Sequence, residues 1–115
     1  MKLIVKQKFC AAHMLNNYEG VCGNLHGHTW LVEVEIAVPD PNTGDGYYEG
    51  VTIDFKEVKE ALRLILPDHQ CINDWCGFNP TAENLALYFK DMLVHALHRD
   101  VKVTVWESDD CAASV

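Results

Sequence analysis

Two long stretches of alternating residues constrain the fold of this chain more than any other feature. One spans residues 2–13 and the other residues 26–38, and in both the apolar side chains fall mostly at every second position. A period of two is typical of a β-strand with one buried face, because successive side chains of a strand point to opposite faces of the sheet. The sequence therefore predicts two long strands, joined by a loop over residues 14–25 that is rich in asparagine and glycine.

Two later segments show the spacing of amphipathic helices, in which apolar side chains recur every three or four residues. Asp54 is a suitable N-cap for the first helix, and Pro67 is expected to stop it. The second helix is expected to begin near Asn79 and Pro80, since proline is favourable at the first helical position. Each helix presents one apolar stripe, so both should pack against the sheet.

Two shorter strands complete the predicted sheet. Residues 39–46 are dense in turn-forming residues and lead to a short returning strand at residues 51–53, and residues 101–106 alternate as a last strand. The order of the elements, with hairpin-like links, predicts an antiparallel four-stranded sheet packed against two helices, which is an α+β architecture. A chain of 115 residues fits a single domain over residues 1–115, because single domains cluster at roughly 100–150 residues.

The charge and the cysteine content exclude several classes of function. The chain carries 17 acidic and 9 basic side chains, a formal net charge of −8. We therefore expect no nucleic-acid partner, because sequence-independent binding requires Lys and Arg to neutralise phosphates, and no docking to an anionic membrane. No apolar run approaches the roughly 20 residues that span a bilayer. Five cysteines cannot all pair, which indicates reduced thiols and a cytoplasmic protein.

Three histidines share the apolar parity of the two long strands. His26 and His28 are two residues apart, so in a strand their imidazoles project from one face, roughly 6–7 Å apart along the chain. His13 continues the apolar face of the first strand. One such histidine alone would more often be a core-edge residue bonded to the backbone, but burying three unpaired imidazoles is costly. Three nitrogen ligands with an open fourth position are the pattern of a catalytic zinc site.

A second ligand set remains open. Cys10 and His13, together with Cys22 and His26, could form a closed structural zinc site with two cysteines and two histidines. Cys10, however, lies on the opposite strand parity from His13. Cys22 lies in the loop that enters the second strand, where a nearby metal ion would lower the pKa of its thiol. We therefore favour the three-histidine site, with Cys22 as a reactive thiol beside it.

Two more segments carry candidate acid–base groups. Asp68 and His69 are neighbours after the first helix, and a carboxylate can orient a histidine as a general acid or base, although adjacent residues need not touch. Glu107 is the next residue on the inward, apolar parity of residues 101–106. A carboxylate on such a face requires a charged or two-pronged donor, unless the strand ends earlier and Glu107 meets water.

Taken in chain order, these segments resemble the family of 6-pyruvoyl-tetrahydropterin synthase and 6-carboxy-tetrahydropterin synthase. The matching motifs are Phe9-Cys10-Ala11-Ala12-His13, Cys22-x3-His26-Gly27-His28, Asp54-Phe55, Asp68-His69-x3-Asn73-Asp74, Asn79-Pro80-Thr81-Ala82-Glu83-Asn84 and Val105-Trp106-Glu107. The match covers nearly the whole chain, and the combination is more specific than any one motif. The short chain is most similar to the bacterial and archaeal 6-carboxy branch, which serves the synthesis of queuosine and related 7-deazapurines.

The resemblance implies a fold, a metal cofactor and a set of site residues. The fold is the tunnelling fold, in which trimers build an antiparallel β-barrel and commonly stack as hexamers, so we expect a homo-oligomer. The cofactor is Zn²⁺. The implied site residues are zinc ligands at His13, His26 and His28, a proton-accepting Cys22, catalytic Asp68, His69 and Glu107, and substrate contacts at Glu107 and Thr81.

The resemblance also implies a reaction on a small pterin. It converts 7,8-dihydroneopterin triphosphate to 6-carboxy-5,6,7,8-tetrahydropterin, with loss of triphosphate and acetaldehyde. Two alternatives stay open, namely a synthase that makes 6-pyruvoyl-tetrahydropterin at the same site and a non-catalytic zinc-binding domain. The presence of Cys22, His69 and Glu107 together speaks against the non-catalytic alternative.

Overall fold

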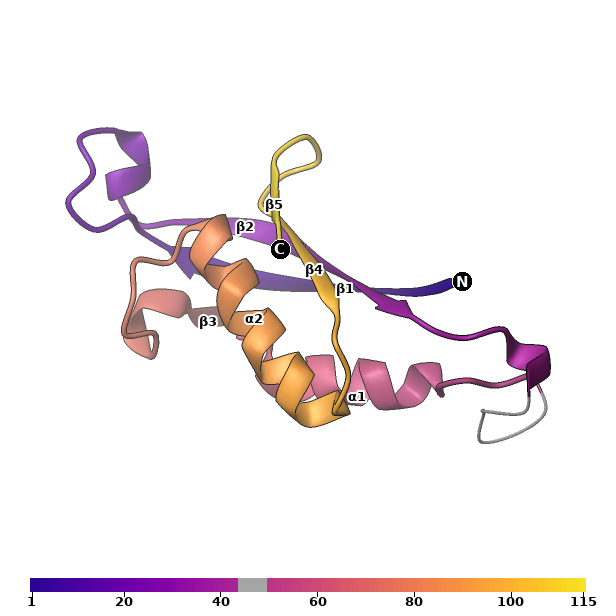
Figure 1. Cartoon of the computed structure of the whole chain (residues 1–115). Coiled ribbons are helices and arrows are strands. Elements are labelled where there is room, and N and C mark those ends of the chain that lie inside the picture. Colours follow the sequence, from indigo (N-terminus) through magenta and orange to yellow (C-terminus); the bar gives the residue numbers. More distant parts are fainter. Residues whose placement is uncertain (44–49) are drawn as a thin grey trace.

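A computed structural model of the chain describes residues 1–43 and 50–115. The end of the expected turn at residues 39–46 lies outside the described residues. In the described part, one sheet carries two helices on the same face, and no helix covers the other face (Figure 1). The architecture is therefore α+β, as the sequence predicts.

The sheet has five strands rather than the predicted four. They are β1 (Lys2–His13), β2 (His26–Ala37), β3 (Gln70–Cys71), β4 (Lys102–Trp106) and β5 (Ala112–Ser114), in the spatial order β3-β1-β2-β4-β5. All neighbouring strands are antiparallel except β3, which runs parallel to β1. The expected strand at residues 51–53 is wrong, because Val51 makes only an isolated bridge before a bend. β3 and β5 have two and three residues, too few to show a period of two in the sequence.

Two α-helices, α1 (Phe55–Ile65) and α2 (Ala82–Leu97), cover the inner face of the sheet. The Asp54 side chain accepts a hydrogen bond from a first-turn amide at 2.8 Å, which confirms the predicted cap. α2 begins two residues after Pro80, because Thr81 is the N-cap and its hydroxyl accepts from the Asn84 amide at 3.2 Å. In the described residues no helix is long and apolar enough to cross a bilayer.

The core lies between the helices and the sheet face with apolar parity. Residues 30, 32, 34 and 36 of β2 have 0% of their surface exposed. The Phe9 ring of β1 stacks on Trp30 at 5.9 Å and meets Phe89 of α2 edge-on at 6.0 Å. The burial pattern of β1 and β2 confirms the parity predicted for residues 2–13 and 26–38.

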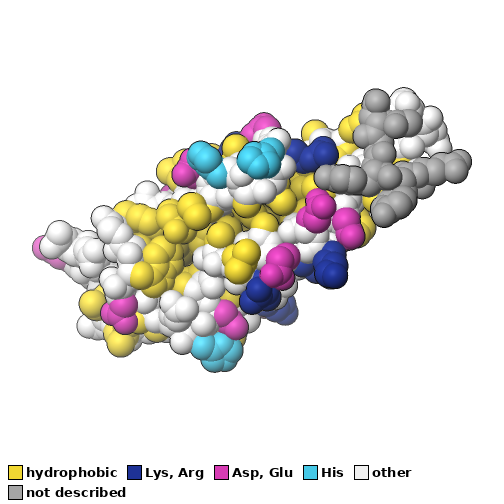
Figure 2. Space-filling view, turned by 90° about the horizontal axis from the view of Figure 1, so that it is seen from below, with side chains coloured by type: hydrophobic (Ala, Val, Ile, Leu, Met, Phe, Trp, Pro, Cys, Tyr) yellow, Lys and Arg dark blue, Asp and Glu magenta, His cyan; other side chains and the backbone are white. Residues whose placement is uncertain are grey.

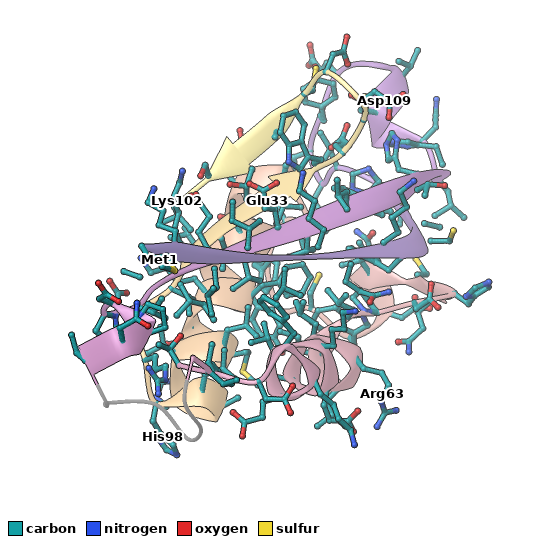
Figure 3. All side chains as sticks on the ribbon, turned by 90° about the vertical axis from the view of Figure 1, so that its right-hand side faces the viewer. Met1, Glu33, Arg63, His98, Lys102 and Asp109 are labelled. Carbon is teal, nitrogen blue, oxygen red and sulfur yellow. The ribbon has the colours of Figure 1, made fainter. Side chains whose placement is uncertain are left out.

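The opposite face of the sheet carries lysine side chains of β1 and β4 that pair with glutamate side chains of β2. Lys6 Nζ lies 2.9 Å from Glu33, and Glu35 contacts Lys2 at 3.2 Å and Lys102 at 2.7 Å. Glu33 and Lys102 lie on the side of the sheet away from the helices (Figure 3). Two of these pairs join residues that the register places directly opposite each other, Lys6 with Glu33 and Lys102 with Glu35. The ion pairs therefore follow the strand register.

Apolar side chains are also exposed on the helix side of the molecule. Figure 2, which views this side, shows hydrophobic side chains gathered over a broad area. The exposed large apolar residues of α1 and α2 are Phe55, Leu64, Leu87 and Met92. The helices therefore bury only part of their apolar surface against the sheet.

Candidate metal centre

The pairing of β1 with β2 brings three histidines together at one end of the sheet. The register sets His13 opposite His26, and His28 follows on the same face two residues later. The ring centroids lie 4.6 Å (His13–His26), 4.9 Å (His26–His28) and 5.1 Å (His13–His28) apart. One ligand nitrogen from each ring lies within 4.8 Å of the others. The shared face predicted from strand parity is thus confirmed, and one metal ion can be reached by all three.

Backbone carbonyls fix the tautomers of two of these rings. His13 donates from Nδ1 to the Pro80 carbonyl at 2.8 Å, and His26 donates from Nδ1 to the Asn24 carbonyl at 2.7 Å. A carbonyl accepts only, so the proton resides on Nδ1 and Nε2 keeps its lone pair. This is the usual arrangement of metal-binding histidines, whose second nitrogen is held by an outer partner.

Two nitrogens of the cluster are buried without a partner. Nε2 of His13 and Nε2 of His28 make no hydrogen bond within the described part of the chain. Buried polar atoms are almost always paired, and an unpaired one is costly. A metal ion bound by the three rings would satisfy both nitrogens at once. The donor set, three imidazole nitrogens with an open position, fits zinc.

Burial favours the neutral, metal-binding form of two of the three histidines. Burial lowers the pKa of His13, opposed by its hydrogen bond to Pro80 and by the charge of Glu107. Burial likewise lowers the pKa of His28, again opposed by Glu107. Metal ligands must be deprotonated, so lowered pKa values preserve the ligand form at mildly acidic pH.

Glu107 lies at the edge of this cluster. It follows β4 directly, and its Oε1 is 3.6 Å from Nε2 of His28, an electrostatic contact rather than a hydrogen bond. Its backbone N–H donates to the Cys111 carbonyl at 3.0 Å, which holds the start of the loop. The side chain is half-buried, with 32% exposed. The carboxylate therefore faces the centre, as the inward parity predicts, and its role toward a ligand stays a prediction.

The two candidate cysteines do not join the histidines. Among the described residues, the group that can hold a metal ion consists of the three histidines alone. Cys22 is half-buried in the short 3-10 helix Val21–Gly23, whose position is held by a bond from the Leu15 amide to the Cys22 carbonyl at 2.9 Å. Cys10 is exposed beside Thr29, with Sγ 3.8 Å from its hydroxyl. The closed site with two cysteines and two histidines receives no support from this geometry.

Asp68 and His69 contact each other at the edge of β1. Asp68 Oδ2 lies 3.0 Å from His69 Nδ1, and Oδ1 accepts from the Cys10 amide at 2.9 Å. These bonds lower the pKa of Asp68, the Cys10 amide being the largest cause. His69 has 82% of its side chain exposed, and it lines the same shallow depression of about 520 Å³ as His28 and Gly27. The pair is formed, although no direct contact joins it to the three histidines in the described residues.

Three further residues support the metal centre, and strand parity in the sequence does not predict them. Asn73 bonds the backbone of Met14, Asn79 bonds the backbone of Asn16, and Pro80 bonds the His13 ring. These contacts join positions 59 to 67 residues apart, so no local periodicity can reveal them. The one signal for them was their place in the Asp68–Asp74 and Asn79–Asn84 motifs. Thr81, expected to contact substrate, uses its hydroxyl to cap α2.

Comparison with known proteins agrees with these motifs. A family model described as 6-pyruvoyl tetrahydropterin synthase matches residues 2–115. A Synechocystis protein named 6-carboxy-5,6,7,8-tetrahydropterin synthase is 36% identical over 93 residues, covering 76% of this chain and 71% of its own. A Pyrococcus furiosus protein named dihydroneopterin monophosphate aldolase is 31% identical, covering 95% and 91%.

The fold has a solved counterpart. The structure of Caenorhabditis elegans 6-pyruvoyl tetrahydropterin synthase superposes with a TM-score of 0.81, covering 100% of this chain and 94% of that chain. The two sequences are 24% identical. The similarity extends over the whole sheet and both helices, so the arrangement that brings the histidines together belongs to a known fold.

Proposed function

The chain belongs to the 6-pyruvoyl tetrahydropterin synthase family of pterin-processing enzymes, and from this premise we propose its reaction. It is a zinc-dependent lyase that converts 7,8-dihydroneopterin triphosphate to 6-carboxy-5,6,7,8-tetrahydropterin, releasing triphosphate and acetaldehyde. Its product would enter the synthesis of queuosine or a related 7-deazapurine. The name of the Synechocystis relative, 36% identical, supports the 6-carboxy product.

The observation that carries this proposal is the three-histidine cluster with a carboxylate at its edge. His13 and His28 present unpaired, buried Nε2 atoms to one point, and Glu107 lies 3.6 Å from His28. A zinc ion held there would act as a Lewis acid toward the hydroxyls of the pterin side chain. Glu107 would accept from adjacent N–H donors on the pterin edge, a pairing that suits a carboxylate. The zinc ion would thus hold the side chain of the substrate, and Glu107 would hold its pterin ring.

Proton transfer is assigned to the remaining polar groups. Cys22 would act as the proton acceptor, since its loop enters the metal-binding strand and its thiol is half-buried. His69, oriented by Asp68 at 3.0 Å, would exchange protons on the other side of the substrate.

Assembly of several chains is part of the same proposal. β3 pairs only with Ala11 and Ala12 of β1, so within the described residues the rest of the β1 edge has no strand beside it. β5 forms the opposite edge. Exposed strand edges pair readily with other chains. We expect chains to join edge to edge in a trimeric barrel, which can stack as a hexamer.

Product analysis tests the reaction. Purified protein, loaded with zinc, is given 7,8-dihydroneopterin triphosphate, and the products are identified by mass spectrometry. We expect 6-carboxy-5,6,7,8-tetrahydropterin together with acetaldehyde. A 6-pyruvoyl product would replace the proposal with the synthase. A parallel assay supplies 7,8-dihydroneopterin monophosphate, and release of an aldehyde from that substrate alone would favour the activity named for the Pyrococcus relative. Absence of any turnover would leave a non-catalytic domain.

A further inference from the structure

Two asparagine side chains hold the end of β1 at the point where it delivers a metal ligand. We define Asn73 and Asn79 as the asparagine clamp. Both are half-buried, and both bond the backbone of residues 14–16, directly after His13. We propose that Asn73 is a positioning residue for His13, acting through the Met14 backbone. This inference rests on the metal centre of the proposed function but assigns a residue that the metal does not touch.

Asn73 acts as a substitute strand partner. Its Oδ1 accepts from the Met14 amide at 3.0 Å, and its Nδ2 donates to the Met14 carbonyl at 2.9 Å. The pairing of β1 with β2 ends at His13 and His26, so in the part of the chain that the structure describes Met14 has no cross-strand neighbour. A planar amide that bonds both polar groups of one residue fixes the direction in which the chain leaves β1. The direction of the His13 side chain is fixed with it.

Asn79 connects the same segment to the beginning of α2. Its Oδ1 accepts from the Asn16 amide at 2.9 Å. Its carbonyl accepts from the Thr81 amide at 2.8 Å and from Asn84 Nδ2 at 2.9 Å. The next carbonyl, that of Pro80, accepts from the His13 ring. The residues before α2 are therefore joined by hydrogen bonds to one another and to the segment after His13. The Pro80 carbonyl among them sets the His13 tautomer.

The geometry explains why His13 needs this support. His13 has 1% of its surface exposed, and its Nε2 must point to the same place as two nitrogens from β2. His13 is the last residue of β1 and His26 the first of β2, so both stand at strand ends. The His26 ring is bonded to a carbonyl two residues away, whereas the partner of the His13 ring is 67 residues away. Strand ends are less constrained than strand interiors, because one side of the ladder is missing. Metal affinity therefore depends on the bonds that hold residue 14.

The two members of the clamp differ in a way that permits a matched test. Asn73 uses both its oxygen and its NH₂ group on Met14. Within the described residues, the Asn79 side chain uses only its oxygen, on Asn16. Aspartate keeps an acceptor but has no donor. Asn73→Asp therefore sets a carboxylate oxygen against the Met14 carbonyl, whereas Asn79→Asp keeps its one bond.

The experiment measures zinc affinity by competition with a chromophoric chelator in wild type, Asn73→Asp and Asn79→Asp. Asn42→Ala, whose side chain bonds only Asp40 in the described residues, is the control for loss of a surface amide. We expect Asn73→Asp to weaken zinc binding about 10- to 100-fold, the usual effect of removing an outer partner of a metal ligand. Asn79→Asp and Asn42→Ala should stay close to wild type.

A second measurement uses the metal-free protein. Ring ¹⁵N chemical shifts report the His13 tautomer, which we expect to be Nδ1–H in wild type and Asn79→Asp and to become mixed in Asn73→Asp. A loss of fold stability alone would not change the tautomer of the folded state. If Asn73→Asp does not fold, Asn73→Gln serves instead, because its longer side chain carries the amide out of register with Met14.

The outcomes separate this inference from the proposed function. Wild-type zinc affinity and an unchanged His13 tautomer in Asn73→Asp would overturn the positioning role. Equal losses in Asn73→Asp and Asn79→Asp would also overturn it, since added charge rather than the lost donor would be the cause. A wild-type protein that binds no zinc would refute the metal centre, and the tautomer would still decide whether Asn73 positions His13.

Discussion

At the residue scale, the three histidines give the most direct test of the metal centre. His28→Ala removes one of three nitrogens, so we expect the purified variant to lose zinc that wild type carries at about one ion per chain. Cys10→Ser is the matched control, because Cys10 is exposed on the opposite face of β1. Elemental analysis after dialysis checks both. Zinc retained after alanine substitution of each histidine in turn would refute the site.

Glu107 offers a second test at this scale. Glu107→Gln keeps the shape of the side chain but turns one acceptor oxygen into a donor, which would face the N–H donors of a pterin. Losing a charged hydrogen-bond partner typically costs roughly 1.5–3 kcal/mol. We therefore expect pterin affinity to fall about 10- to 100-fold, measured by titration of zinc-loaded protein with dihydroneopterin.

Zinc content and thermal stability separate this effect from a loss of structure. Both should stay near wild type in Glu107→Gln, because the backbone bond of Glu107 to Cys111 does not involve the side chain. Unchanged pterin affinity would mean that the pterin is held elsewhere.

The sequence predicts these residues unequally well, for a physical reason. His13, His26, His28 and Glu107 are found by parity, because alternation along a strand fixes the face of each side chain. Asn73 is not, because its bonds to Met14 cross 59 positions and depend on how the segment before α2 folds back. A side chain that hydrogen-bonds the backbone of a distant segment produces no periodic pattern in the sequence.

At the element scale, the N-terminus of α2 offers a test, because Thr81 was expected to contact substrate and instead caps the helix. Thr81 caps the helix, so Thr81→Ala should lower the free energy of unfolding by about 1 kcal/mol, and Thr81→Ser should retain most of the stability. Urea denaturation checks both variants. Equal stability of Thr81→Ala and wild type would show that the hydroxyl does not stabilise the helix as a cap.

The same scale shows why some elements were predictable and others were not. β1 and β2 have 12 residues each, long enough for a period of two to be evident. β3 has two residues and is defined by its parallel contact with Ala11 and Ala12, a property of tertiary structure. The strand expected at residues 51–53 does not form, because β propensity alone does not supply a neighbouring strand to pair with.

At the scale of the whole molecule, stability should depend on pH through the histidine cluster. The pKa of His13 and that of His28 are lowered from 6.5 by burial, so the unfolded chain binds these protons at a higher pH than the folded chain. The stability from these groups is fully present above about pH 6.5 and is lost as pH falls toward the folded pKa values. Metal-free protein should therefore show a falling urea midpoint between pH 7.5 and 5.5.

His13→Gln provides the control, because glutamine does not titrate. Its urea midpoint should change less with pH than that of wild type over the same range. The hydrogen bond from Lys102 lowers the pKa of Glu35, and the Cys10 amide lowers that of Asp68, so these carboxyl groups titrate below this window. A midpoint independent of pH would contradict the coupling.

The mass in solution tests assembly. We expect light scattering to give three or six times the 13.0 kDa of one chain, because among residues 1–43 and 50–115 most of the β1 edge has no strand beside it. A mass of one chain at all concentrations would contradict assembly through the strand edges.

The ion pairs on the outer face of the sheet also bear on how the chain avoids misfolding. A slip of two residues between β1 and β2 would leave every apolar side chain on its proper face, so hydrophobic burial discriminates weakly against it. Such a slip in one direction sets Lys6 opposite Leu31 and His13 opposite Asn24, losing an ion pair at the middle of the hairpin and a ligand at its end. In that direction the charged outer face and the metal centre both disfavour the slip, from opposite faces of one hairpin. Chains trapped in that register would be recognisable by their failure to bind the ion.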